Sequence, residues 1–124
     1  MKILTIDDQF LATYFVQRIL SNRGYTVKTA SDGLEGVKMF EQFKPDLVIV
    51  DYHMPIMNGV EVIEYIRTKK NSNIPILIMS GSTDINIKEK GFELGIADYL
   101  EKPVDLDKLV RVVSSLFERA SIAI

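Results

Sequence analysis

The most constraining feature of the sequence is a repeated alternation between short aliphatic runs and longer amphipathic segments. Apolar runs begin near Ile3, Tyr25, Leu47 and Ile76, and a weaker run begins near Tyr99, at spacings of about 22, 22, 29 and 23 residues. A strand followed by a crossover helix needs about this much chain. The alternation therefore predicts a parallel sheet with helices on both faces.

Glycine, proline and capping residues divide the intervening chain into five helical segments. Gly24 follows the first segment, and Pro45 and Pro75 follow the second and third. Glycine commonly caps a helix end, and proline disfavours helix in the residue before it. The fourth segment ends near Gly95, and Asp105 is a suitable N-cap for the fifth. Each strand is thus expected to be followed by one helix.

The composition of the five runs separates central strands from edge strands, and the resulting arrangement fits one known strand order. Residues 3–6, 47–50 and 76–79 are almost entirely apolar, as expected for strands buried on both faces. Residues 25–29 and 98–101 are mixed, as expected for edge strands. The prediction is an α/β fold of the flavodoxin-like type: a five-stranded parallel sheet of order 2-1-3-4-5, doubly wound with five helices.

Length and composition narrow the class of protein further. A chain of 124 residues suits one domain spanning residues 1–124. The absence of cysteine excludes disulfides, thiolate catalysis and cysteine metal sites. A net charge of -2 gives no large basic field for nucleic acid or a membrane surface. The chain shows no signal peptide and no apolar stretch long enough to span a bilayer, so the expected location is the cytoplasm.

Polar residues stand where the predicted strands end. Asp7 and Asp8 follow the first strand, Asp51 ends the third, Ser80 ends the fourth, and Lys102 follows the fifth. In a parallel sheet these ends lie at one edge, where folds of this class bind ligands. We therefore expect three carboxylates, a hydroxyl and an ammonium group to converge.

Three neighbouring carboxylates require compensating positive charge. Two unit charges at 4 Å repel by roughly 1 kcal/mol in water and by about 4 kcal/mol at an effective dielectric constant of 20. Lys102 supplies one positive charge, and a hard divalent cation such as Mg²⁺, bound by oxygen ligands, would supply two. A phosphoryl group would complete both the metal shell and the lysine pair, and a carboxylate nucleophile can accept it.

This ordered set of residues on five strand–helix units resembles the receiver domain of two-component response regulators, over about residues 2–119. The resemblance implies that Asp51 is the phosphoacceptor. It also implies that Asp8 and Asp51 bind Mg²⁺ directly, with Mn²⁺ as a substitute. Asp7 would assist directly or through water, and the backbone carbonyl of His53 would be a further ligand.

The resemblance also assigns roles to three other positions. Lys102 would pair with the phosphoryl group, and Ser80 would hydrogen-bond it and move towards it. Tyr99 matches a switch position whose aromatic ring turns inward when Ser80 moves. The peptide bond between Lys102 and Pro103 is expected to be cis. The surface formed by the fourth helix, fifth strand and fifth helix would then change.

The implied partners are proteins. A histidine kinase or phosphotransfer protein would donate the phosphoryl group, and the domain would assist its own phosphorylation and dephosphorylation without being an enzyme. A downstream protein partner is expected, and a phosphorylation-linked homodimer is an alternative. Direct binding to nucleic acid or to a membrane is not expected. The chain is expected to be either a standalone regulator or the front of a longer one.

Three other functions compete with this interpretation. A phosphatase with an aspartate nucleophile usually carries a second acid two residues later, where this chain has His53. A flavin site needs a loop rich in hydroxyls and glycine after the first strand, and Asp8-Gln9-Phe10 does not provide one. A phosphorylation-independent interaction module would not need the complete polar set. Taken one at a time, the residues also allow simpler interpretations. Asp7 and Asp8 could serve merely as caps of the first helix, and Tyr99 could be a static aromatic ring on the surface.

Overall fold

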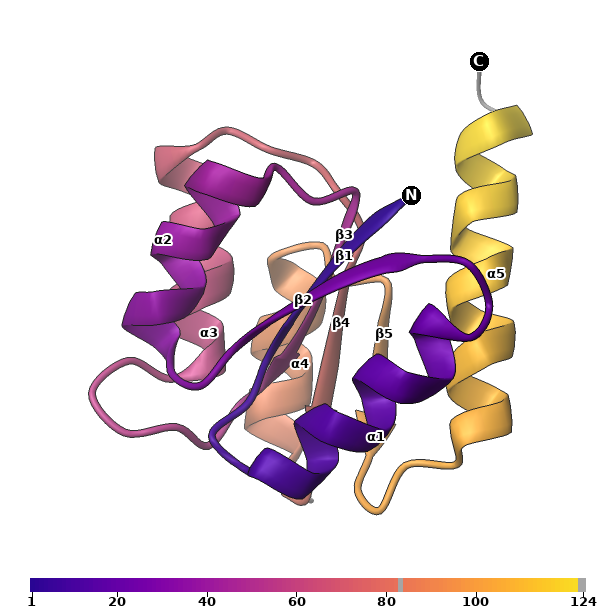
Figure 1. Ribbon diagram of the computed structural model, residues 1–124. Helices are drawn as coiled ribbons and strands as arrows, with labels where there is room; N and C mark the ends of the chain where they lie inside the picture. The colour runs from indigo at the N-terminus through magenta and orange to yellow at the C-terminus, as the bar shows by residue number, and fades with distance from the viewer. Residues whose placement is uncertain (83, 123–124) are drawn as a thin grey trace.

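A twisted sheet with helices on both faces forms the protein, and the computed structural model describes residues 1–82 and 84–122 (Figure 1). The strands are β1 (Lys2–Ile6), β2 (Thr26–Ala30), β3 (Leu47–Asp51), β4 (Ile76–Ser80) and β5 (Asp98–Glu101). The helices are α1 (Phe10–Ser21), α2 (Gly33–Phe43), α3 (Gly59–Glu64), α4 (Ile85–Glu93) and α5 (Leu106–Ile122). The predicted alternation of strand and helix is confirmed.

The strands pair in parallel in the order β2-β1-β3-β4-β5, which confirms the predicted order. In this register Asp51 lies beside Met79, and Ser80 lies beside Glu101. All carboxyl ends of the strands therefore meet at one edge of the sheet, called here the carboxyl edge. The opposite edge, where the chain enters the strands, is called the amino edge.

Alternate residues of the central strands feed two separate cores, because side chains in a strand point to opposite faces. The core beneath α2, α3 and α4 contains from these strands Leu4, Ile6, Val48, Val50, Ile76 and Ile78. The core beneath α1 and α5 contains from them Ile3, Leu47, Ile49, Leu77 and Met79. Figure 1 shows the two groups of helices on opposite faces. Burial on both faces explains why these runs are almost entirely apolar.

Capping residues set the helix boundaries. Asp32 accepts a hydrogen bond from the backbone N–H of Glu35 at 2.7 Å. Asp105, the predicted cap of α5, accepts from the N–H groups of Asp107 and Lys108. After α1 the chain turns through Gly24, whose φ of 92° suits glycine. These contacts confirm the sequence signals at the helix ends.

The third helical segment departs from a regular helix. After α3 the chain forms a π-helical turn, η1 (Tyr65–Lys69), in which the N–H of Lys70 donates to the carbonyl of Tyr65 at 3.1 Å. The segment ends before Ile74, as expected, but the change of helix type carries no sequence signal. Within the described residues, no helix has both the length and the apolar character needed to cross a bilayer.

Candidate functional site

Four strand ends bring the predicted polar residues to the carboxyl edge. Asp7 and Asp8 directly follow β1, and Asp51 is the last residue of β3. Ser80 is the last residue of β4, and Lys102 follows β5 directly. Because the aliphatic parts of β1, β3 and β4 are buried on both faces, these polar residues stand on rigid supports.

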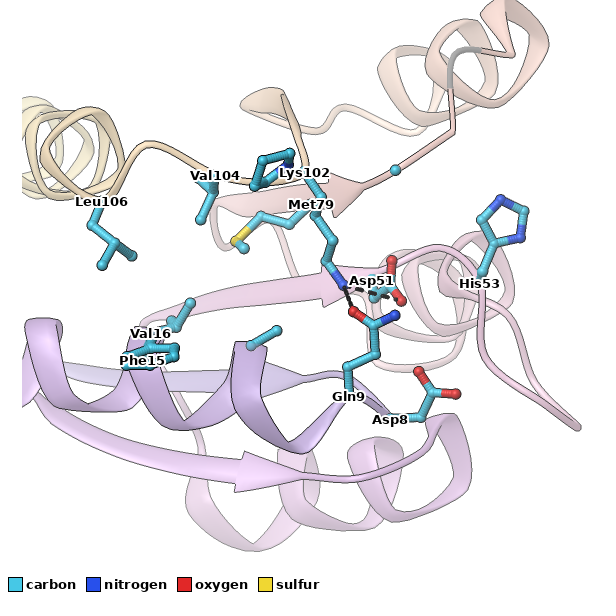
Figure 2. A pocket seen from close by; sticks show the side chains of 13 residues that line it. Asp8, Gln9, Phe15, Val16, Asp51, His53, Met79, Lys102, Val104 and Leu106 are labelled. Atoms are coloured by element: carbon cyan, nitrogen blue, oxygen red, sulfur yellow. Dashed lines mark hydrogen bonds and ion pairs between the residues drawn. The ribbon is translucent and has the colours of Figure 1, made fainter.

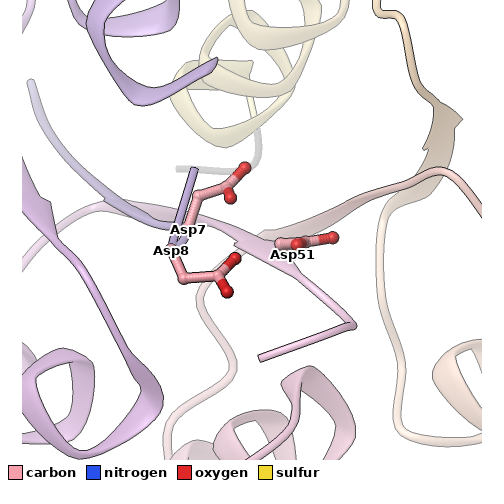
Figure 3. A group of neighbouring side chains, drawn as sticks. All are labelled: Asp7, Asp8 and Asp51. Atoms are coloured by element: carbon pink, nitrogen blue, oxygen red, sulfur yellow. The ribbon is translucent and has the colours of Figure 1, made fainter. Parts of the chain in front are cut away.

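Three aspartates form a compact acidic group. Oxygen atoms of Asp7, Asp8 and Asp51 all lie within 4.8 Å of one another (Figure 3). Asp7 is 6% exposed and Asp51 is 5% exposed, whereas Asp8 faces solvent. Two carboxylates are thus held out of water beside a third.

Among the described residues, Lys102 is the cation that contacts this group. Its Nζ donates to Asp7 Oδ2 at 2.7 Å and lies 3.5 Å from Asp51 Oδ2. It also donates to Gln9 Oε1 at 3.1 Å (Figure 2). The backbone N–H of Gln9 donates to Asp7 Oδ1 at 2.9 Å. Gln9 therefore orients both the lysine and one acid. Sequence reasoning gave Gln9 no site role, and its position directly after Asp7-Asp8 was the available signal.

The electrostatic balance of the site is uneven. Burial raises the pKa of the Asp51 carboxyl, and the negative charges of Asp7 and Asp8 raise it further, whereas Lys102 opposes the shift. One ammonium group faces three carboxylates. The ionised form of Asp51 is therefore costly in this structure, and a further positive charge at the site would relieve that cost.

The donor set fits a hard divalent cation. All three acidic side chains offer oxygen, which Mg²⁺ and Mn²⁺ accept, and their spacing allows one ion to contact all three. The side chain of His53 is exposed, and Figure 2 shows its ring away from the acidic group. The ring instead makes a T-shaped contact with Tyr52, with 4.7 Å between ring centroids. A role for the backbone carbonyl of His53 stays a prediction.

Ser80 and Tyr99 are linked by hydrogen bonds to the backbone of Ser82. Ser80 is completely buried, and its Oγ accepts a hydrogen bond from the N–H of Ser82 at 3.1 Å. The Tyr99 hydroxyl donates to the carbonyl of Ser82 at 2.9 Å. Tyr99 is only 8% exposed, so its ring lies inward in this structure and is not a surface aromatic. Its predicted motion on phosphorylation stays a prediction.

The structure thus brings Asp7, Asp8, Asp51 and Lys102 together directly, with Ser80 at the end of the adjacent strand. The peptide bond between Lys102 and Pro103 is cis, as expected from the resemblance. Asp51 and Lys102 also line a cavity of about 610 Å³ that extends towards α1 and the segment between β5 and α5. The acidic group therefore sits at one end of a larger hollow.

Comparison with known proteins gives a consistent family match. Residues 3–114 match the family model described as the response regulator receiver domain. The chain is 33% identical over 119 residues to the response regulator MprA of Mycobacterium leprae, covering 96% of this chain and 52% of that protein. It is 32% identical over 120 residues to the cell cycle transcriptional regulator CtrA of Caulobacter vibrioides, covering 97% and 52%. The chain thus spans about half the length of these relatives.

A solved structure with a similar fold carries the same description. The response regulator receiver domain protein from Clostridium thermocellum superposes with a TM-score of 0.90 at 28% identity. The superposition covers 99% of this chain and 98% of that chain. Likeness at this level extends over the whole sheet and both helical layers.

Proposed function

This chain belongs to the response regulator receiver family, and from that premise we propose that it is a phosphorylation-dependent switch with Asp51 as the phosphoacceptor. Receiver domains are in general signalling domains and not enzymes, and they take phosphoryl groups from donors such as histidine kinases. The donor proposed here is a histidine kinase or a phosphotransfer protein. The observation that carries the proposal is the buried Asp51 carboxylate, which lies beside two acids and one lysine.

The proposed reaction is a direct phosphoryl transfer. An oxygen of Asp51 forms a bond to phosphorus, the phosphorus–nitrogen bond to the donor imidazole breaks, and the imidazole keeps the electron pair. Lys102 is placed to pair with the phosphoryl oxygens, because its Nζ already lies 3.5 Å from Asp51 Oδ2. The developing negative charge would be stabilised by such fixed positive groups.

Metal dependence follows from the charge balance. Asp7, Asp8 and Asp51 would hold Mg²⁺, which supplies positive charge against the phosphoryl oxygens when bound. From the chain itself, Lys102 offsets part of the cost of ionising Asp51. Lys102 does so through its contacts with Asp7 and Gln9, which fix the ammonium group beside the nucleophile.

The signal is proposed to leave the site through Ser80. A phosphoryl group on Asp51 adds about 1.5 to 2 negative charges and new acceptor oxygens. Movement of Ser80 Oγ towards it would disturb the hydrogen bond from Ser82 N–H, and Ser82 also holds Tyr99. Because Tyr99 already lies inward, the expected response is a change in how firmly the surface of α4, β5 and α5 is held.

Intact-mass spectrometry with acetyl phosphate and Mg²⁺ tests the acceptor. The chain should gain one phosphoryl group, the Asp51→Asn variant should gain none, and the matched Asp107→Asn variant, altered in an exposed acid of α5, should behave as wild type. An equal mass gain in Asp51→Asn would show that another residue is the acceptor.

Chemical shifts measured with Mg²⁺ and beryllofluoride, a phosphoryl mimic, test the route of the signal. Changes should extend from Asp51 through Ser80 to Tyr99 and α4, and should vanish in Asp51→Ala. Changes confined to the three acids would mean that the site binds its ligand without this route.

A further inference from the structure

Gln9 stands at the N-cap position of α1 but does not cap the helix. Its backbone is extended, and its side chain makes no capping hydrogen bond to the turn that follows. Ser, Thr, Asp and Asn are preferred at this position, because their short side chains accept from the free N–H groups of the first turn. A residue that breaks such a local rule is expected to serve a function instead.

The Gln9 side chain reaches across to the acidic group. Its Oε1 accepts from Lys102 Nζ at 3.1 Å, and its backbone N–H donates to Asp7 Oδ1 at 2.9 Å. The backbone carbonyl of Gln9 also accepts from the N–H of Thr13 at 3.1 Å. Both the backbone and the end of the side chain are therefore fixed, and the amide group is held at the site.

The contact with Lys102 determines which way the amide faces. An ammonium group only donates hydrogen bonds, so the amide oxygen must face it and the amide nitrogen must point elsewhere. Figure 2 shows this nitrogen away from Lys102, on the side of Asp51. Among the described residues, these contacts leave the second lone pair of Oε1 and the N–H groups of Nε2 available at the site.

The cavity in front of Asp51 is the space from which water would reach a phosphoryl group on this residue. Attacking and leaving oxygens lie roughly in line on opposite sides of phosphorus, so the water arrives opposite the Asp51 oxygen. Among the described residues, the polar side chains that line the cavity are those of Asp8, Gln9, Asp51, His53 and Lys102. Carboxylates only accept hydrogen bonds, the lysine only donates, and Figure 2 shows His53 turned away. Gln9 is the group placed to do both.

We infer that Gln9 is a catalytic residue for a second reaction, the hydrolysis of phospho-Asp51, and that it thereby sets how long the phosphorylated state lasts. The inference rests on the proposed function, since Asp51 must first carry the phosphoryl group. Oε1 of Gln9 accepts a hydrogen bond from the attacking water, and Nε2 donates to a phosphoryl oxygen. A glutamine side chain orients the attacking water in other phosphoryl-transfer proteins as well.

The reaction needs only water. The water oxygen forms a bond to phosphorus, and the bond from phosphorus to the Asp51 oxygen breaks. Its electron pair stays on the Asp51 carboxylate, and both hydrogens of the water leave with the product as dihydrogen phosphate. Lys102 has two parts in this step, because it holds the Gln9 amide and offsets charge on the phosphoryl oxygens.

A serine variant separates this role from a structural one. Gln9→Ser removes the amide but supplies a preferred N-cap, so the variant should be at least as stable as wild type in urea unfolding. The protein is loaded with acetyl phosphate and Mg²⁺ and freed of the donor by rapid desalting, and the loss of the phosphoryl group is followed by intact mass. The hydrolysis rate constant should fall about tenfold, less than the roughly 10²–10³-fold typical of a buried donor, because Gln9 is exposed.

Gln17→Ser is the matched control, because Gln17 lies on the same helix and borders a different hollow with Tyr14 and Ser31. It should hydrolyse as wild type. The decay is first order, so a difference in the extent of loading leaves the rate constant unaffected.

A glutamate variant tests which atoms act. Gln9→Glu keeps an oxygen for Lys102 but loses the N–H donor, and its charge repels the phosphoryl oxygens. Hydrolysis should therefore slow as it does in Gln9→Ser. The order parameter of the Lys102 ammonium group, from nitrogen relaxation, should fall only in Gln9→Ser. Hydrolysis at or above the wild-type rate in either variant would overturn the inference.

The same experiment distinguishes the two levels of the argument. If the wild type gains no phosphoryl group on Asp51, the proposed function fails and this inference fails with it. If Asp51 is phosphorylated but its hydrolysis does not depend on Gln9, only this inference fails.

Discussion

Arg67 is partly buried and Asp51 is buried, and the two charged residues lie at opposite edges of the sheet. Their charges are compensated by different kinds of partner. Arg67, in η1, donates to four backbone carbonyls in the loops that lead into β4 and β5, those of Ser72, Ile74, Leu94 and Gly95. Asp51, at the carboxyl edge, shares a single ammonium group with Asp7. Burial lowers the pKa of Arg67 and raises that of Asp51, each towards the uncharged form.

The difference separates a structural charge from a reactive one. Together, the contacts of Arg67 fix two loops of the amino edge to η1. Its hydrogen bonds therefore stabilise the fold. The acidic group leaves negative charge in excess, which a further cation can balance. Excess charge of one sign on rigid strand ends is therefore the physical mark of the site.

Breaking the amino-edge network should have the largest effect. Arg67→Met keeps an apolar stem but removes the donors to four carbonyls, so we expect a loss of about 3 kcal/mol in the free energy of unfolding. Urea unfolding followed by circular dichroism measures it. Arg18→Met, in an exposed residue of α1, is the matched control and should cost under about 0.5 kcal/mol. Equal losses in the two variants would contradict the structural role of Arg67.

Removing one acid should instead impair metal binding and leave folding intact. Asp8→Asn removes a proposed charged ligand, so we expect Mg²⁺ affinity to fall at least about tenfold, or about 1.4 kcal/mol. Because Asp8 is exposed, the free energy of unfolding without metal should change little. Calorimetric titration with Mg²⁺ is the measurement, with Asp107→Asn as control. Unchanged affinity in Asp8→Asn would remove it from the ligand set.

The uneven charge balance predicts a stabilising substitution. The pKa of Asp51 is raised in the folded protein, so its ionisation opposes folding. The penalty is absent below the unfolded value of 3.8, grows as the pH rises towards the folded value, and is fully present above it. Asp51→Asn should therefore raise the free energy of unfolding at pH 7 without metal by about 1 kcal/mol. Urea unfolding at pH 7 and at low pH measures the gain.

Two further conditions sharpen that prediction. At low pH the advantage of Asp51→Asn should disappear, because the wild-type carboxyl is then protonated. Saturating Mg²⁺ should reverse the order, because metal binding would stabilise the wild type and the variant lacks one of the proposed ligands. A variant that is less stable than wild type at pH 7 without metal would contradict the proposed excess of negative charge.

Much of the carboxyl edge could be predicted from sequence because strand ends carry positional information. Asp51 follows four aliphatic residues, so its place at the edge follows from the strand itself. Lys102 likewise directly follows the fifth strand. The orientation of Tyr99 could not be predicted, since it depends on a hydrogen bond to Ser82, seventeen residues earlier. Gln9 was missed because a neutral side chain acquires its role only through its neighbours.

The amino edge was less predictable than the fold that contains it. The four carbonyl partners of Arg67 are backbone atoms, and backbone atoms leave no residue-specific pattern in the sequence. The π-helical turn that carries Arg67 could not be predicted from the sequence either, because its residues suit an ordinary α-helix. What the sequence did signal there was backbone conformation: Gly24 and Gly95 both have positive φ.

The smallest expected effect on stability concerns residues with a positive φ angle in the loops at the two edges. Positive φ falls on Gly24 and Gly95 in the loops entering β2 and β5, and on Lys44 and Asn71 in the loops entering β3 and β4. In the loop after β3 it falls on Ile56, at 72°. Ile56 centres a three-residue turn closed by the Met57 N–H and the Pro55 carbonyl at 2.8 Å. Ile56 differs from the other four in being β-branched, and a β-branched residue is strained in this conformation.

Ile56→Gly should therefore stabilise the protein slightly. Relief of a positive φ is worth roughly 1–2 kcal/mol, and the greater unfolded-state entropy of glycine offsets about 0.5–1 kcal/mol, which leaves a gain of about 0.5 kcal/mol. The Ile56 side chain is 80% exposed, so little buried area is lost. The reciprocal variant Gly95→Ala, at a φ of 78°, should lose about 1 kcal/mol. Urea unfolding of both variants decides the matter: if Ile56→Gly loses stability as Gly95→Ala does, the carboxyl edge stores no strain at Ile56.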